Sequence, residues 1–282
     1  MEETILGIVE KSCRIHRDVI AVKYLSHREI VEKSYGDLWD DIRKTAVILN
    51  NNGLQGTHIA LVGSSSYEWI CAYMAILFTG NTAVPLDANL SAPELHELLN
   101  RSGSTALFCG ASRKDVIAEM TSDCPGVNVV ITMEKPVDIE PTADSALNSQ
   151  LAIMSFEQLR SETAIPENFA FAPQDKDKMC TLMYTSGTTG KSKGVMLSQF
   201  NLAQNVENVF VDLEPGVTIL SVLPIHHAFC LTMEWMKGIS LGATICINDS
   251  LLHMLKNMKR FQPVGMPVSY THLRAHETRS NL

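Results

Sequence analysis

The sequence predicts an α/β fold in which mostly parallel sheets are covered by helices. Short β-type runs alternate with amphipathic helical runs through the first half of the chain, which is typical of βαβ units. The 282 residues are 45% hydrophobic and 19% charged, an ordinary composition for a domain with a core to bury. No run approaches the roughly eighteen uninterrupted apolar residues of a membrane span, so a soluble chain is expected.

The first βαβ unit is predicted between residues 59 and 86. Residues 59–62 (Ile-Ala-Leu-Val) form a buried β-type run, and Gly-Ser-Ser-Ser at residues 63–66 ends it. Residues 69–78 then have helical character, and residues 82–86 (Thr-Ala-Val-Pro-Leu) form the next strand.

A second unit follows with the same alternation. The pattern predicts a helix over 92–100, a strand over 106–108, a helix over 114–120 and a strand over 127–132. We find no repeat period and no low-complexity tract in the chain.

An acidic segment then interrupts the pattern at residues 133–178. It holds nine Asp or Glu against four Lys or Arg, is rich in proline and shows little periodicity. We therefore expect a solvated surface excursion. The whole chain carries a formal charge of −8, which argues against general nucleic-acid binding.

The seven cysteines favour a reducing compartment. Their number is odd, they form no CxxC pair, and several lie inside apolar runs, so buried free thiols are expected. The N-terminus, MEETILGIVEKSC, lacks the basic-then-apolar form of a signal peptide. Both features predict a cytoplasmic protein.

A polar, glycine-punctuated loop follows this segment. From Thr185 to Gly194 the residues are five hydroxyls, three glycines and two lysines. Residues 178–184 and 195–197 on either side are β-type, so the loop is predicted to join two strands. Ser198 can then cap a helix whose apolar residues recur at helical spacing, namely Leu202, Val206, Val209 and Phe210.

The loop composition suits a chain of phosphates. Small residues let the backbone approach a ligand, consecutive N–H groups form an anion-binding concavity, and lysines add positive charge. A Walker P-loop would need glycine where Thr185 stands and a helix immediately after the loop, so that alternative fits poorly. A structural Gly/Ser/Thr linker would seldom lie between two β-type runs.

The loop and its flanks at residues 184–195 resemble, with the sequence YTSGTTGKSKGV, the phosphate-loop signature of the adenylate-forming (AMP-binding) superfamily. This superfamily includes acyl-CoA synthetases, firefly luciferase and peptide-synthetase adenylation domains. The family usually has proline where this chain has Ser192. Other elements resemble the family in order from about residue 34 to 263, namely Ser34-Tyr35-Gly36-Asp37-Leu38, Val84-Pro85-Leu86-Asp87 and Leu223-Pro224-Ile225-His226-His227.

The resemblance implies an ATP-dependent, two-step reaction. A carboxylate attacks the α-phosphate of ATP to give acyl-adenylate and pyrophosphate, and the thiol of coenzyme A then displaces AMP. Catalysis depends on positioning and neutralising phosphates. The residues implied to hold the β- and γ-phosphates are Thr185, Ser186, Gly187, Thr188, Thr189, Gly190 and Lys193, with Thr188 and Lys193 acting in catalysis.

His227 matches the family histidine or aromatic residue that lines the entrance of the acyl pocket, which implies a catalytic role, whereas His226 is expected to be structural. Amino-acid-activating members carry an aspartate in this element, but no acid lies between Ser221 and Met233. The acid is therefore expected to lack an α-amino group. The apolar residues 228–231 favour a fatty acid over an aryl acid, and peripheral membrane association is compatible with this.

The family pattern stops at about residue 264. Residues 265–282 include SYTHLRAHETR, which resembles translated sequencing-adapter DNA. Residues 1–264 are thus expected to form an incomplete N-terminal domain, without the elements that bind adenine and Mg²⁺ or the C-terminal lid, and the chain is expected to be inactive. The alternatives are a non-catalytic ATP-binding module, a P-loop hydrolase, or a ligase with a carrier-protein acceptor; the metal ligands stay unknown.

Overall fold

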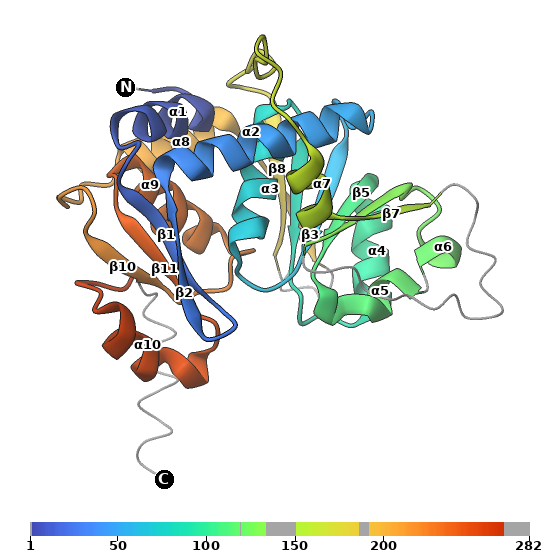
Figure 1. Cartoon of the computed structure of the whole chain (residues 1–282). Helices are drawn as coiled ribbons and strands as arrows, with labels where there is room; N and C mark the ends of the chain where they lie inside the picture. Colours follow the sequence, from blue (N-terminus) through green and yellow to red (C-terminus); the bar gives the residue numbers. More distant parts are fainter. Residues whose placement is uncertain (1, 119, 134–150, 186–191, 268–282) are drawn as a thin grey trace.

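The computed structural model describes residues 2–118, 120–133, 151–185 and 192–267, which form two sheets with helices between and around them (Figure 1). The strands are β1 (Ile20–Ser26), β2 (Glu29–Ser34), β3 (His58–Val62), β4 (Thr82–Leu86), β5 (Ser104–Cys109), β6 (Val129–Thr132), β7 (Ala152–Ser155), β8 (Met179–Thr185), β9 (Lys193–Ser198), β10 (Thr218–Ser221) and β11 (Thr244–Ile247). The α-helices are α1 (Ile5–Ile15), α2 (Tyr35–Asn51), α3 (Tyr67–Phe78), α4 (Ala92–Ser102), α5 (Lys114–Ala118), α6 (Met120–Asp123), α7 (Phe156–Glu162), α8 (Gln199–Glu207), α9 (Lys237–Ser240) and α10 (Met254–Phe261). Short 3₁₀ turns span η1 (Ala111–Arg113) and η3 (Leu251–His253), and η2 (Cys230–Met236) is a π-helix.

The larger sheet has the strand order β7-β6-β5-β3-β4-β8-β9. Its strands are parallel except for β9, which runs antiparallel to β8. The predicted βαβ units are therefore confirmed, with strands at 58–62, 82–86, 104–109 and 129–132 and helices between them. The carboxyl ends of the parallel strands meet at one edge, where ligands bind in open α/β sheets.

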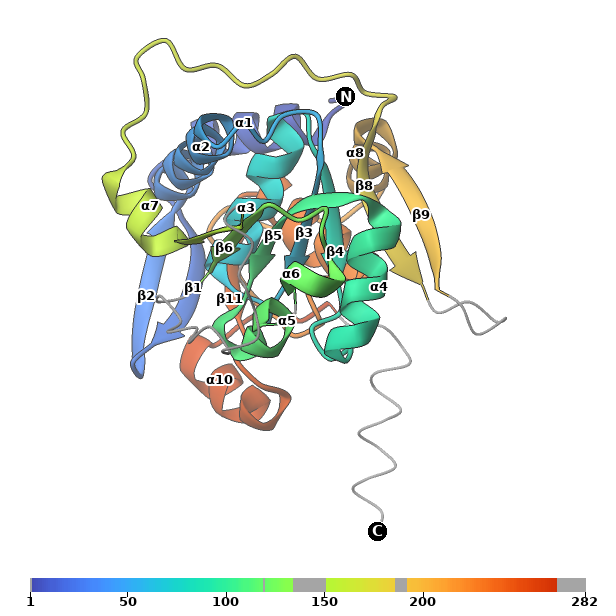
Figure 2. The same ribbon diagram turned by 90° about the vertical axis from the view of Figure 1, so that its right-hand side faces the viewer.

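Both faces of the central strands of this sheet are buried. On β3, Ile59 and Leu61 join a core cluster that includes α3, whereas Ala60 and Val62 join a second cluster on the other face that includes α4 and α5. This alternation follows from the two-residue period of a strand. Figure 2 shows α4 and α5 on one side of β3–β5, with α2 and α3 on the other.

The smaller sheet has the order β10-β11-β1-β2, with β10, β11 and β1 parallel and β2 antiparallel to β1. Helices α1 and α2 share one core cluster with residues of both sheets. At the start of α2, the Tyr35 hydroxyl donates a hydrogen bond to the carbonyl of Ala243, 2.7 Å away at the entry to β11. This bond ties α2 to the smaller sheet.

Two sequence-based expectations were wrong in detail. Within 133–178, predicted to be a solvated excursion, β7 pairs with β6, and α7 buries Phe156 edge-on against Phe108. The two short elements close one side of the larger sheet, and residues 134–150 lie outside the described residues. The helix that begins after the Ser198 cap ends at Glu207, so Phe210 lies beyond it and is fully exposed.

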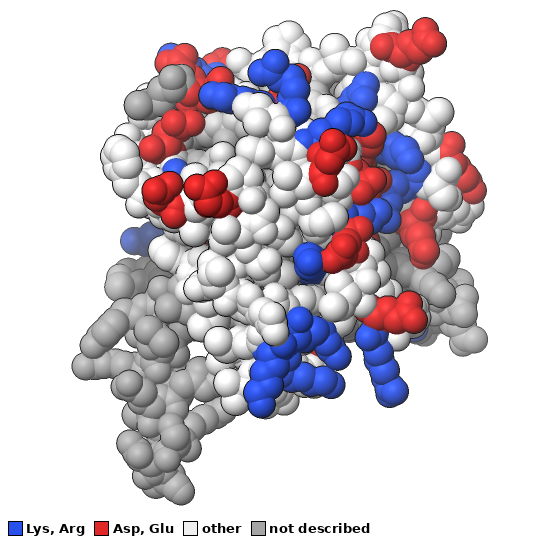
Figure 3. All heavy atoms as spheres, turned by 60° about the vertical axis from the view of Figure 1, so that its left-hand side comes forward, with Lys and Arg blue, Asp and Glu red and all other residues white. Residues whose placement is uncertain are grey.

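Charges of both signs are interspersed over the face shown in Figure 3, with Lys and Arg gathered toward its lower end. Helix α10 lies at that end of the molecule in Figure 1 and carries Lys256, Lys259 and Arg260 without an acidic residue. All seven cysteines are buried free thiols, which confirms the prediction.

Candidate functional site

The predicted phosphate loop is carried by the β8–β9 hairpin. Thr185, the last residue of β8, is opposite Lys193, the first residue of β9, and both are exposed. They lie at the end of the hairpin where residues 186–192 connect the two strands, here called the hairpin mouth. The strand–loop–strand arrangement expected from the sequence is confirmed. The other predicted loop residues lie outside the described residues, namely Ser186, Gly187, Thr188, Thr189 and Gly190.

Arg101 braces this hairpin from the neighbouring helix. Its Nη2 atom donates a hydrogen bond to the carbonyl of Ser192 at 2.7 Å, and its guanidinium lies 5.5 Å from the centre of the Tyr184 ring. The two contacts hold both strands of the hairpin mouth to the last turn of α4. Sequence reasoning missed Arg101 because nothing in the local pattern links it to residues about ninety positions away.

Strand β4 brings Asp87 to the same sheet edge as the hairpin mouth. Ala83 of β4 pairs with Thr181 of β8 in parallel register. Asp87 and Thr185 each lie four residues further along, so both leave the sheet at its carboxyl edge. The sequence predicts no role for Asp87 beyond its place in the Val84–Asp87 element.

The Pro224–His227 turn faces Asp87 from the smaller sheet. The His227 backbone N–H donates to the carbonyl of Pro224 at 3.0 Å and closes the turn that follows β10. The His227 side chain is exposed, whereas the His226 side chain is only 11% exposed. His226 Nε2 lies 3.7 Å from Asp87 Oδ1, and the two histidine ring centres are 4.3 Å apart.

Burial lowers the pKa of His226 to about 4; the negative charge of Asp87 opposes this shift and His227 adds to it. The His226 ring is therefore neutral near pH 7. Its Nε2 atom is buried and has no hydrogen-bond partner among the described residues.

A buried carboxyl group supports the same turn from behind. Glu234, in the π-helix η2, accepts hydrogen bonds from the Ser221 hydroxyl and from the backbone N–H of Leu223, the latter at 3.4 Å. Cys230 Sγ lies 3.2 Å from Glu234 Oε2 and 3.4 Å from the Leu223 carbonyl. Burial raises the pKa of Glu234 to about 7. Sequence reasoning missed Glu234, since it lies one position beyond the acid-free stretch 221–233 and no local pattern predicts its contact with Leu223.

The comparisons with known proteins agree with this architecture. The sequence matches the family of AMP-binding enzymes over residues 9–279. The chain belongs to this family. It is 30% identical over 227 residues to a probable acyl-activating enzyme of Arabidopsis thaliana, and 25% identical over 249 residues to a long-chain-fatty-acid–CoA ligase of Mus musculus. These alignments cover 75% and 83% of this chain, but 31% and 34% of the relatives.

The chain thus spans about a third of the length of these curated relatives. A solved anthranilate–CoA ligase in complex with anthranoyl-AMP superposes with a TM-score of 0.79 over 93% of this chain and 49% of its own, at 17% identity. The fold is therefore that of the N-terminal part of an adenylate-forming enzyme, with mostly parallel sheets flanked by helices, as predicted.

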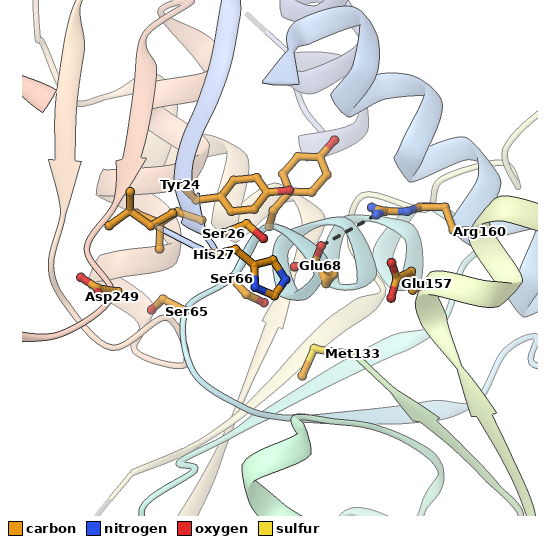
Figure 4. Close-up of a pocket in the computed structure, with 13 residues that line it drawn as sticks. Tyr24, Ser26, His27, Ser65, Ser66, Glu68, Met133, Glu157, Arg160 and Asp249 are labelled. Atoms are coloured by element: carbon orange, nitrogen blue, oxygen red, sulfur yellow. Dashed lines mark ion pairs between the residues drawn. The ribbon is translucent and has the colours of Figure 1, made fainter. Parts of the chain in front are cut away.

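A cavity of about 570 Å³ lies elsewhere in this AMP-binding fold, between the ends of β1, β3, β6 and β11 and helix α7. Figure 4 shows Arg160 of α7 pointing toward Glu68 at the start of α3, with 3.8 Å between their charged atoms. Neither Thr185, Lys193 nor the two histidines of the turn line this cavity. The described ones among the predicted site residues lie elsewhere: Thr185 and Lys193 at one end of the β8–β9 hairpin, and His227 in the Pro224–His227 turn.

Neither a metal-binding cluster of side chains nor a membrane span is found in the described part of this family member. No group of three or more His, Cys, Asp or Glu side chains could hold a metal ion there. Over the same residues, no helix combines the length and the hydropathy needed to cross a bilayer.

Proposed function

We propose that this AMP-binding domain takes part in the ATP-dependent activation of a carboxylic acid. The acid carboxylate attacks the α-phosphorus of ATP, and the bond to pyrophosphate breaks as the acyl-adenylate forms. The thiol of coenzyme A then attacks the acyl carbon, and AMP leaves with the bonding electrons. The proposal depends on the position of the β8–β9 hairpin in a chain of this family. The hairpin mouth lies at the same sheet edge as Asp87, and Asp87 in turn lies close to His226 of the Pro224–His227 turn.

The residues at the hairpin mouth suit the first step. Thr185 offers a hydroxyl donor and Lys193 a positive charge, and both are exposed where a triphosphate could reach them. We assign them to the β- and γ-phosphates together with Ser186, Gly187, Thr188, Thr189 and Gly190. Positioned cations at these phosphates lower the barrier because negative charge accumulates on the departing pyrophosphate. None of the described residues is assigned to Mg²⁺.

The acid is proposed to be a fatty acid. The likeness to a long-chain-fatty-acid–CoA ligase supports this. We propose that His227 lines the entrance of the acyl pocket. The Glu234 carboxyl is fully buried and bonded to its own chain, so it is not open to a substrate ammonium group. An aryl acid is the alternative, supported by the fold shared with an anthranilate–CoA ligase; a carrier-protein acceptor is another.

Replacing Lys193 tests the assignment of the phosphate site. We expect Lys193→Ala to weaken ATP binding to the chain by about tenfold, because one charge-assisted contact is lost. Lys178→Ala is the matched control, since Lys178 is exposed beside the opposite end of β8. Isothermal titration calorimetry with ATP measures both. Equal affinity of wild type and Lys193→Ala would contradict the assignment.

Product analysis separates the remaining functions. A longer protein that contains this sequence and matches its relatives in length should release pyrophosphate when given ATP and a fatty acid. A P-loop hydrolase would release orthophosphate instead. Binding of ATP without either product would favour a non-catalytic nucleotide-binding module. The 282-residue chain by itself is proposed to bind ATP without turnover, since it spans about a third of its relatives.

A further inference from the structure

The contact between Asp87 and His226 joins the two sheets at the proposed site. Asp87 follows β4 of the larger sheet, and His226 lies in the turn after β10 of the smaller sheet. The side-chain atoms Asp87 Oδ1 and His226 Nε2 are 3.7 Å apart. That distance is about half an ångström beyond the usual hydrogen-bond range, so a small shift brings the two groups into contact.

The chemistry of the ring favours such a bond. A neutral imidazole carries its proton on one nitrogen, and His226 Nε2 is buried without another hydrogen-bond partner among the described residues. Leaving a buried donor unsatisfied costs about 1–3 kcal/mol, whereas a hydrogen bond to a carboxylate is among the stronger ones. Asp87 keeps about a third of its side chain exposed, so its carboxylate stays hydrated on its other side.

We propose that Asp87 and His226 form a positioning pair, in which His226 Nε2–H donates to the Asp87 carboxylate and fixes the Pro224–His227 turn against the carboxyl edge of β4. The pair holds the neighbouring His227 ring beside the hairpin that carries Thr185 and Lys193. Its effect on catalysis rests on the proposed function, but the hydrogen bond itself does not.

The surroundings of the turn support this role. Behind the turn, Glu234 binds the Leu223 N–H and Cys230 approaches the Leu223 carbonyl, so the backbone before Pro224 is fixed. In front, the contact to Asp87 fixes the residue next to His227. A turn held on both sides places His227 more rigidly than its exposure alone would suggest.

The titration of His226 in the chain itself tests the hydrogen bond. The ionisable side chains that act on this ring are Asp87 and His227. In ¹⁵N-histidine-labelled protein we expect the Nε2–H tautomer of His226 at pH 7. Asp87→Asn should lower the pKa of His226 further, because the Asp87 carboxylate favours the charged form of the ring. An unchanged midpoint, or a dominant Nδ1–H tautomer, would overturn the pair.

Asp249→Asn is the matched control for this titration. Asp249 Oδ2 lies 2.8 Å from His253 Nδ1 in an exposed pair, and Asp249 is not among the charged groups that act on His226. The control should move the His253 resonance and leave that of His226 in place. Movement of His226 in both variants would mean a general change in structure and would also overturn the specific pairing.

Kinetics in a protein of the relatives' length test the consequence for catalysis. Asp87→Asn and His226→Leu should lower kcat for pyrophosphate release about tenfold, with KM for ATP changed less than about twofold, as expected for a positioning effect of about 1.4 kcal/mol. His226→Gln should recover most of the rate, because its amide Nε2 can donate to Asp87. If His226→Gln were as slow as His226→Leu, packing rather than hydrogen bonding would explain the loss and the pair would be rejected.

The titration and the kinetics can each give a negative result without the other. If the wild-type protein released no pyrophosphate, the proposed function would be rejected, while the titration would still decide whether Asp87 and His226 are paired. If the titration showed no pairing while wild type was active, the proposed function would stand and the positioning pair would not.

Discussion

At the scale of single residues, Glu234 shows how burial changes the chemistry of a carboxyl group. Its side chain is fully buried, and its pKa is raised to about 7 because the charged form loses hydration. The folded protein therefore binds a proton at Glu234 more tightly than the unfolded chain does, where the pKa is about 4.5. Stability from this residue is full below about pH 4.5 and declines as the pH rises to about 7.

Glu234→Gln should remove this pH dependence. The amide stays neutral, its oxygen can accept from the Leu223 N–H, and its NH₂ group can donate to the Ser221 hydroxyl, so we expect the free energy of unfolding to be flatter between pH 5 and 7. It should also be higher at pH 8, by an amount on the order of 3 kcal/mol at most. Urea denaturation across this pH range measures it, with the exposed Glu97→Gln as control. If the free energy of unfolding of the variant depended on pH as strongly as that of wild type, Glu234 would not be the source of this pH dependence.

At the scale of elements, the β8–β9 hairpin depends on α4 for its alignment. Arg101 donates a hydrogen bond to the carbonyl of Ser192, just before β9, and its guanidinium lies over the ring of Tyr184 in β8. A planar guanidinium can make both contacts at once, whereas a lysine ammonium cannot.

Arg101→Lys should therefore loosen the hairpin mouth even though it keeps the charge. We expect the amides of Tyr184 and Gly194 to exchange with solvent about fivefold faster, from the loss of about 1 kcal/mol. Hydrogen exchange measured by NMR checks this. Arg14→Lys, at an exposed arginine in the last turn of α1, should leave these amides unchanged. Unchanged exchange in Arg101→Lys would argue against the brace.

The elements also show how far the sequence could predict the structure. Strands such as 82–86 were predictable because a strand buried on both faces is a continuous apolar run between turn residues. Strand β7 was missed because it is short and at the sheet edge, with Ala152 and Ile153 exposed, so its pattern is weak. For the site, the loop residues came from local sequence, but the approach of His226 to Asp87 is a long-range contact that no local pattern encodes.

At the scale of the whole molecule, an ionic cluster centred on Asp41 joins α2 to α7 and β2. Asp41 accepts a hydrogen bond from the Tyr67 hydroxyl at 2.9 Å, and its Oδ2 lies 3.4 Å from Lys33 Nζ and 3.5 Å from Arg160 Nη1. The Asp41 side chain is 12% exposed and that of Arg160 is 17% exposed, so both charges depend strongly on their partners.

Arg160→Met should destabilise the whole chain by about 3 kcal/mol, because it leaves Asp41 and Glu68 in a poorly hydrated place with less positive charge. Thermal and urea unfolding measure the loss. Arg17→Met is the control, since Arg17 pairs with Asp40 at 3.8 Å with 63% of its side chain exposed, and it should cost less than about 1 kcal/mol. Similar losses of unfolding free energy in both variants would show that the burial of Arg160 and Asp41 does not determine how much their ion pair contributes to stability.

The π-helix η2 has a consequence for how this region can vary in length. A π-helix holds more residues per turn than an α-helix, so the four-residue spacing from Cys230 to Glu234 makes slightly less than one turn and both side chains face Leu223. Deleting one residue from 231–233 would let the segment relax into regular α-helical winding, in which a three-residue spacing also makes slightly less than one turn, so the carboxyl group would stay beside Leu223. Buried helices seldom tolerate a change of length, but here the loss of one residue should be less damaging than the same deletion elsewhere in the core.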